Sequence, residues 1–223
     1  MNINEVKELT ELIVNKNNGQ WSVARFNQAA PSAVWDWFNI CFGQPILSKN
    51  GNQSNDMIWQ STEKLSNNLR PFVKNIILQV DSQGKAQRPS DFVQTSSIRF
   101  FNDKKQTDVR FVRDNNLGGY LDSALLEPTK KYPIYCIYDN YLQFYPKDLM
   151  RVSFTYLRKP ATPVWGYTIV NGRPVYDPLT STDVDFPDEN INEITSRIVS
   201  LMGINIREPQ VQQYAQVKMQ TGS

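Results

Sequence analysis

The sequence predicts an α+β fold in which helices at both ends of the chain flank a central antiparallel β-sheet or sandwich. Apolar residues recur at helical spacing over residues 1–72, and an alternation of β-branched and aromatic residues replaces that spacing over 73–159. An extended, proline-rich arm follows over 160–187, and helical spacing returns over 188–223. We expect these four regions to form one integrated structural unit.

The N-terminal region predicts three helices. The first covers residues 3–13, where apolar side chains recur every three to four positions behind a capping-box pattern. The second covers 22–43, and Pro31 either restarts or kinks it. The third lies within 57–72 and ends near Pro71.

The central region predicts strands, because six runs are rich in β-branched and aromatic residues. These runs are residues 73–80, 92–101, 109–112, 134–138, 141–145 and 152–157. Asp139-Asn140, between two of the runs, predicts a two-residue hairpin turn, a position that favours residues tolerant of positive φ. We interpret residues 117–120 as a turn and 121–126 as a short helix that Pro128 ends.

The C-terminal third predicts an extended arm followed by helices. Prolines punctuate the arm, and Asn171-Gly172 predicts a hairpin tip. Residues 191–202 place isoleucines on one helical face, and carboxylates precede that helix where the positive end of its dipole lies. A final helix over 210–218 is expected after a proline suited to a first turn.

Composition argues against most catalysis. The 223 residues include no histidine, which removes the commonest general base and metal ligand. Two cysteines, Cys41 and Cys136, cannot form a thiolate zinc site and are interpreted as buried small hydrophobes. With 24 Lys+Arg against 22 Asp+Glu, the net charge of +2 does not predict a polycation for nucleic acid. We therefore expect no enzyme activity, no catalytic residue, no cofactor and no metal.

Membrane association is also not expected, since no apolar run approaches the roughly 18–20 residues of a membrane span.

Four carboxylates lie close together in the sequence, at Asp183, Asp185, Asp188 and Glu189. Such a group could hold a divalent cation or act in acid/base chemistry. Capping of backbone N–H groups at the following helix is the favoured interpretation.

A second candidate is the segment around residues 100–113, where cations and phenylalanines alternate. This mixture can hold single-stranded nucleic acid. Aspartates interleave with the cations, so a solvated strand face with paired charges is favoured. Strand alternation would place Arg110 with Val112 on one face and Val109 with Phe111 on the other.

The arm supplies the strongest candidate contact residues. Trp165, Tyr167 and Tyr176 are expected to be exposed on it, and Arg158 precedes it. Exposed aromatics could stack on sugar rings, which would make the protein a monomeric carbohydrate-binding module. They could instead insert into a neighbouring subunit with Arg158 as a rim contact, and we favour this interpretation because an extended arm orders on a partner at low cost.

The order of several motifs carries a family resemblance. They are residues 21–27, 34–39, Phe42-Gly43, Leu69-Arg70-Pro71-Phe72, Arg88-Pro89-Ser90-Asp91-Phe92, Glu127-Pro128-Thr129, Tyr132-Pro133-Ile134-Tyr135, Phe144-Tyr145-Pro146, 152–160, 183–189 and 204–208. Together these resemble the neck and tail-ring structural proteins of crAss-like tailed bacteriophages, over about residues 21–216.

The resemblance implies a head-tail connector protein, a subunit of a homo-oligomeric ring, typically a twelvefold dodecamer, stacked between portal and tail. Such a ring is part of the DNA conduit used in ejection, meets passing double-stranded DNA without sequence recognition, and performs no enzymatic step. It belongs to the virion and assembles in the host bacterial cytoplasm. Trp35 and Trp37 depart from the family, where smaller or more polar residues are expected. This departure leaves open which ring of the stack the chain would form.

Overall fold

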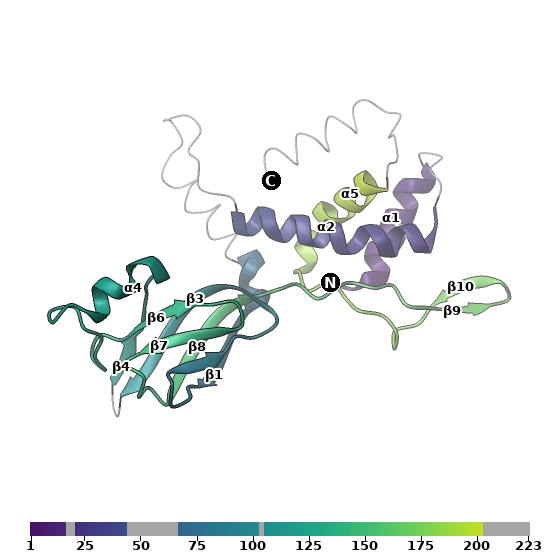
Figure 1. Cartoon of the computed structure of the whole chain (residues 1–223). Helices are drawn as coiled ribbons and strands as arrows, with labels where there is room; N and C mark the ends of the chain where they lie inside the picture. The colour runs from purple at the N-terminus through teal and green to yellow at the C-terminus, as the bar shows by residue number, and fades with distance from the viewer. Residues whose placement is uncertain (17–20, 44–66, 103–104, 203–223) are drawn as a thin grey trace, which may run out of the picture. The chain divides into compact units, whose positions relative to one another are not determined.

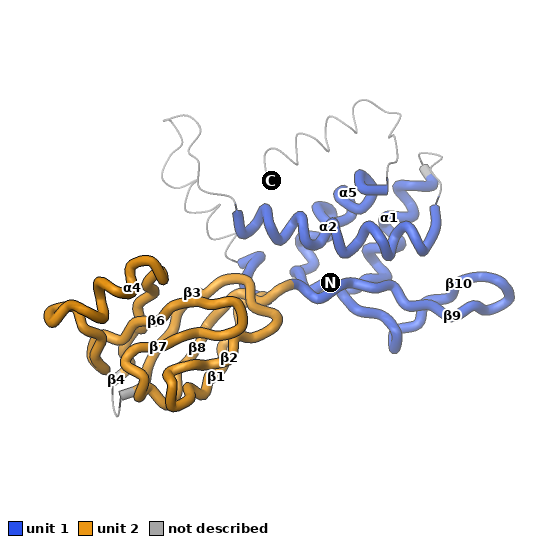
Figure 2. The backbone as a smooth tube through the Cα atoms, in the orientation of Figure 1, with its two compact units in different colours: residues 1–71, 160–223 blue, residues 72–159 orange. Residues whose placement is uncertain are grey.

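The computed structural model describes residues 1–16, 21–43, 67–102 and 105–202. Its helices and its antiparallel and mixed sheets make the protein an α+β fold, as the sequence predicts (Figure 1). The chain forms two compact units where the sequence suggested one (Figure 2). Unit 1 combines Met1–Pro71 with Pro160–Ser223, and unit 2 is Phe72–Lys159. The predicted arm therefore belongs to the same unit as the helices from both chain ends.

The described part of unit 1 is built on three α-helices, α1 (Ile3–Lys16), α2 (Val23–Gly43) and α5 (Ile191–Leu201). Helix α5 packs against both α1 and α2. The isoleucines at 194 and 198 are fully buried, as are Phe26 and Phe38 of α2. The helical spacing in the sequence thus marks the faces that meet in this core.

The predicted helices are confirmed for α1, α2 and α5, with two details added by the structure. Helix α2 continues through Pro31 without a second start, since the alanines at 29, 30 and 33 are buried and hold this turn in the core. The apolar face predicted over 191–202 is not buried to its end, since Leu201 in the last turn of α5 is about half exposed. Most of the helix predicted over 57–72, and all of that over 210–218, lies outside the described residues.

Unit 2 contains two four-stranded sheets, and its strands are numbered in chain order. The first sheet has the order β1 (Val73–Gln79), β8 (Arg151–Arg158), β3 (Phe92–Asn102) and β4 (Lys105–Asp108), all antiparallel. The second has the order β2 (Lys85–Gln87), β7 (Tyr141–Tyr145), β6 (Ile134–Ile137) and β5 (Arg110–Phe111), with β5 parallel to β6. One apolar cluster contains side chains from both sheets, which makes unit 2 a small sandwich.

Alternation along β8 shows how the sandwich is filled. Val152, Phe154 and Tyr156 point into the core and are buried, and the residues between them are only partly buried. The Phe154 and Tyr156 rings stack with centroids 4.9 Å apart. The period-two pattern therefore predicts correctly which face of this strand is covered.

Helix α4 (Asp114–Leu121) corrects two sequence predictions. Residues 117–120 are helical rather than a turn, and residues 121–126 are not a helix, because α4 ends at Leu121 and a turn follows. Buried Leu117 joins a cluster with Val112 and Ile134, and this tertiary contact outweighs the low helix propensity of the two glycines beside it.

The short strand β5 also departs from expectation. Val109 and Val112 are both buried, whereas Arg110 and Phe111 between them are both exposed. Simple alternation fails here because the strand has only two residues, so Val109 and Val112 lie outside it.

Two predicted hairpins are confirmed. The Asp139-Asn140 turn joins β6 to β7, and the Tyr138 N–H donates to the Tyr141 carbonyl at 2.9 Å. Among the described non-glycine residues only Asn171 has a positive φ, so this turn is not of the expected positive-φ kind. Asn171 (φ 50°) and Gly172 (φ 76°) close the hairpin of β9 (Tyr167–Val170) and β10 (Arg173–Tyr176), as a type I′ turn requires.

Candidate interaction surface

The β9–β10 hairpin is the best candidate functional element of unit 1. In Figure 1 it extends away from the helices of its own unit as an isolated two-stranded sheet. Nine of its ten residues are exposed, and Ile169 has an exposed fraction of 73%. A two-stranded ribbon is marginally stable by itself in water. Its exposed apolar side chains therefore indicate a surface that another molecule covers.

The strand register divides the hairpin into two faces. Tyr167 is opposite Tyr176 and Ile169 is opposite Pro174, so these four uncharged residues share one face. We call this the apolar face. The other face carries two valines together with Thr168 and the cation Arg173.

The base of the hairpin is anchored by Trp165. Its exposed fraction is only 2%, and its ring stacks on Tyr167 at 5.7 Å and on Tyr176 at 5.9 Å. The indole Nε1–H donates to Asn4 Oδ1 at 2.9 Å. Asn27 holds the backbone on both sides, since its Oδ1 accepts from the Trp165 N–H at 2.9 Å and its Nδ2 donates to the Trp165 carbonyl at 3.0 Å. The hairpin is thus fixed to α1 by the side chain of Trp165 and to α2 by the backbone of the same residue.

The segment after β10 locks the same base. The Asp177 N–H donates to the Gly166 carbonyl at 3.0 Å, and the Ser181 hydroxyl donates to the Asp177 carbonyl at 2.7 Å. A Cβ at Gly166 would overlap Thr180, with the Thr180 carbonyl carbon and oxygen at 2.6 and 2.7 Å. Only glycine allows the two segments to approach this closely.

The structure corrects the predicted role of the arm aromatics. Trp165, Tyr167 and Tyr176 do come together, but Trp165 is buried against its own chain and is not an exposed contact residue. Arg158 packs within unit 2, where its guanidinium lies 5.6 Å from the centre of the Phe72 ring and its Nη1 donates to the Lys159 carbonyl. The exposed residue that the sequence analysis missed is Ile169, although the aliphatic side chains on both sides of Asn171-Gly172 were a visible signal.

The acidic group does not form a metal centre. Among the described residues, no cluster of three or more Cys, Asp or Glu is placed to hold a metal ion. Asp183 Oδ1 accepts from the Ile3 N–H at 2.9 Å, and Asp185 Oδ2 accepts from the Ala161 N–H at 2.8 Å. Asp183 therefore caps the first turn of α1, and the side chain at the N-cap of α5 makes no capping hydrogen bond. Capping was the favoured interpretation, and the helix that is capped differs from the expected one.

The cationic segment around β3 and β4 carries a paired charge. Arg99 Nε lies 3.3 Å from Asp108 Oδ1, while Arg110 and Phe111 are exposed. The described part of the segment does not form a continuous basic stripe, because Asp108 lies between its cations. This pairing agrees with a solvated strand face rather than a nucleic-acid groove.

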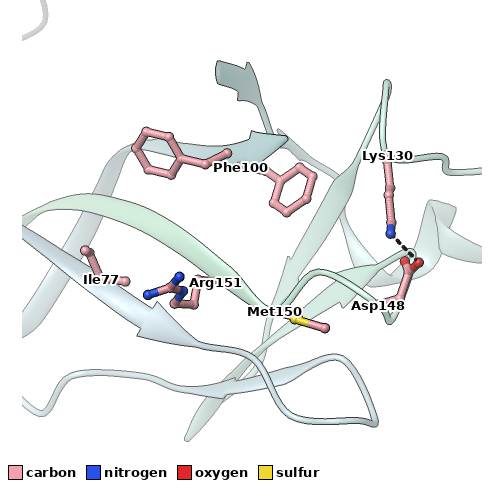
Figure 3. Close-up of a pocket in the computed structure, with 7 residues that line it drawn as sticks. Ile77, Phe100, Lys130, Asp148, Met150 and Arg151 are labelled. Atoms are coloured by element: carbon pink, nitrogen blue, oxygen red, sulfur yellow. Dashed lines mark ion pairs between the residues drawn. The ribbon is translucent and has the colours of Figure 1, made fainter. Parts of the chain in front are cut away.

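Unit 2 presents a hollow on the outer face of its first sheet (Figure 3). Its volume is about 370 Å³, and three large apolar side chains around it are exposed: Ile77 at 63%, Phe101 at 51% and Met150 at 79%. Charged groups lie beside them, namely Arg151 and the ion pair of Lys130 with Asp148 at 2.8 Å. Apolar side chains beside charges are the arrangement of an interface core and rim. We call this the Met150 hollow.

Unit 2 has further concave surface. A second hollow of about 450 Å³ adjoins the first and shares Asp148 and Met150 with it. A separate groove of about 560 Å³ lies beside α4 and is lined by Leu125, Leu126 and Tyr132, with Leu125 93% exposed. No helix in the described part of the chain combines the length and hydropathy needed to cross a bilayer.

Comparison with known proteins adds no relative. No protein-family model matches the chain, and no curated protein matches it significantly. The sequence motifs and the surfaces described above are therefore what bears on function.

Proposed function

We propose that the protein is a virion structural protein, a subunit of a homo-oligomeric ring in the portal-tail connector of a tailed bacteriophage. In this role it joins portal to tail and forms part of the DNA conduit, and it acts by assembly rather than by catalysis. The motif resemblance supplies the family, the neighbouring proteins and the twelvefold symmetry of this proposal. The observation that carries it is the anchored β9–β10 hairpin with its exposed Ile169.

The hairpin supports assembly for a physical reason. Its base is rigid, because Trp165 is buried and hydrogen-bonded, while its strands expose apolar side chains. A preorganised element loses little conformational entropy when a partner covers it. A ring subunit needs such an element, since every copy must bury surface against two neighbours.

The charge balance suits a conduit. A strongly cationic lumen would bind passing phosphates and slow ejection, whereas the net charge here is only +2. The alternative, a carbohydrate-binding module, uses Trp165, Tyr167 and Tyr176 as exposed stacking residues. Trp165 is buried against the two tyrosines and the Lys7 ammonium, 5.1 Å from the ring centre, so one of the three is not accessible to a sugar, and we favour assembly.

The test is the mass of the purified protein by mass photometry, alone and mixed with candidate portal or neck proteins. We expect a discrete ring-sized species in at least one of these conditions. Ile169→Asp should reduce that species to monomer. Leu12→Asp is the control and should not, because Leu12 has a similar exposed fraction but lies on α1 and not on the hairpin. A wild-type protein that stays monomeric in every condition contradicts the proposal.

A further inference from the structure

The Met150 hollow is an apolar surface on unit 2, and the hairpin is an apolar projection of unit 1. Resting on the ring function above, we propose that the ring contact is head-to-tail: the apolar face of the β9–β10 hairpin of one copy docks in the Met150 hollow of a second copy.

The strand register explains why this sheet face can receive a second layer. Val152 and Phe154 of β8 point into the sandwich, so Ser153 and Thr155 lie on the outer face between β1 and β3. Their side chains are short, and Asn75 binds both hydroxyls, with Nδ2 3.1 Å from Ser153 Oγ and 2.6 Å from Thr155 Oγ1. A face of short side chains allows another sheet to approach to the usual spacing of about 10 Å.

The larger apolar side chains stand at one end of this face. Figure 3 shows Ile77 and Met150 at the border of the hollow, with Lys130 and Asp148 facing each other at one side. A ligand that covers Ile77 and Met150 would remove apolar surface from water and leave the ion pair at the edge. Burial of this kind is the main source of binding energy in protein interfaces.

The charges on the hairpin agree with docking through the apolar face. Tyr167, Ile169, Pro174 and Tyr176 carry no charge, so none is desolvated when they cover the hollow. Arg173 is the charged residue of the hairpin and lies on the opposite face, beside Val170. It therefore does not meet Arg151 or Lys130, the two cations that line the hollow, inside the contact.

The area of the hairpin also fits a contact that is repeated around a ring. Its ten residues would expose roughly 1,700 Å² as an unfolded chain. About half of that surface is still exposed in the folded unit, and the apolar face holds about half of this remainder, on the order of 400 Å². Each single contact is therefore small, but every ring subunit makes two of them, one through its hairpin and one through its hollow. A small ligand would leave most of this area uncovered, whereas a second copy of the chain covers it.

Head-to-tail docking has a consequence for assembly. Each copy carries one hairpin and one hollow, so every docked pair leaves a free hairpin at one end and a free hollow at the other. Such a heterologous contact closes into a ring when the rotation between copies permits. An interface of two identical hairpins would stop at a dimer.

The experiment is a complementation test with two variants, Ile169→Asp and Met150→Asp. Both side chains are mostly exposed, so circular dichroism should report wild-type folding. Each variant alone should fail to assemble, with association weakened roughly tenfold or more, as expected for the loss of an interface anchor. In an equimolar mixture, the hollow of the Ile169→Asp variant and the hairpin of the Met150→Asp variant are both unaltered. These two surfaces should bind each other, which gives a one-to-one dimer that cannot grow further.

Two control variants complete the test. Leu12→Asp places the same change on α1, and Leu125→Asp places it in the groove beside α4. Both should keep the wild-type mass. A Leu125→Asp variant that loses assembly while Met150→Asp keeps it would assign the contact to the other groove and overturn the proposal.

The remaining outcomes separate the two proposals. A ring that survives Met150→Asp, or a mixture of Ile169→Asp and Met150→Asp that stays monomeric, overturns the head-to-tail contact and leaves the ring function standing. A wild-type protein that is monomeric alone and with every partner overturns both.

Discussion

Replacing Trp165 with alanine is the most informative test of the hairpin anchor. The side chain is 2% exposed, stacks on two tyrosines and donates one hydrogen bond to Asn4. Truncation of a buried Trp or Phe costs about 3–5 kcal/mol, mainly through the cavity that remains. The unpaired Asn4 oxygen adds roughly 1 kcal/mol. We expect a loss near 5 kcal/mol, which is a large part of the about 5–15 kcal/mol that stabilises a typical domain.

The assay is urea unfolding followed by far-ultraviolet circular dichroism at fixed protein concentration, because assembly adds to apparent stability. The signal reports mainly on unit 1, which contains the three longest described helices. Trp35→Ala is the matched control, since Trp35 is 41% exposed and should cost much less. Trp165→Phe keeps a stacking ring but loses the hydrogen bond, about 1 kcal/mol, and part of the buried volume, so its cost should lie between those of wild type and Trp165→Ala. A Trp165→Ala variant within about 1 kcal/mol of wild type would refute the anchor.

Three further predictions concern other positions. Gly166→Ala should lower the melting temperature, because its Cβ overlaps the Thr180 backbone, whereas Gly118→Ala meets open space within α4 and should stabilise by about 0.5–1 kcal/mol. Burial raises the pKa of the Cys41 thiol to about 11, so native protein at pH 8 should react with a thiol reagent far more slowly than unfolded protein; equal rates would contradict this. Burial opposes ionisation of Asp91, but the hydrogen bonds from Tyr156 and Lys74 outweigh it and hold the pKa of Asp91 below its ordinary value. Ionised Asp91 therefore adds stability above the unfolded pKa near 4, and this stability is lost as the pH falls through the lower folded pKa. Tyr156→Phe should flatten that acid-side loss in thermal melts, and an unchanged pH dependence would contradict the assignment.

The sequence alone determined the elements whose side chains repeat with a clear period. The helical spacing of α1 and α5 and the alternation along β8 are direct consequences of which face is buried, so they can be read without a structure. The Asn171-Gly172 turn was equally readable, because positive φ at both positions strongly restricts the residue types. The sequence also grouped Trp165 with the two arm tyrosines as contact residues, but it did not predict that the three rings stack on one another.

Tertiary structure decided the features that depend on distant partners. Trp165 is buried because Asn4 and Asn27, far away in the chain, meet it, and no local pattern encodes that meeting. Helix α4 forms across two glycines because Leu117 finds a buried cluster, which overrides local propensity. The exposure of Ile169 is decided in the same way: an aliphatic residue in a strand is expected to be covered, and only the folded unit shows that its own chain leaves this side chain in solvent.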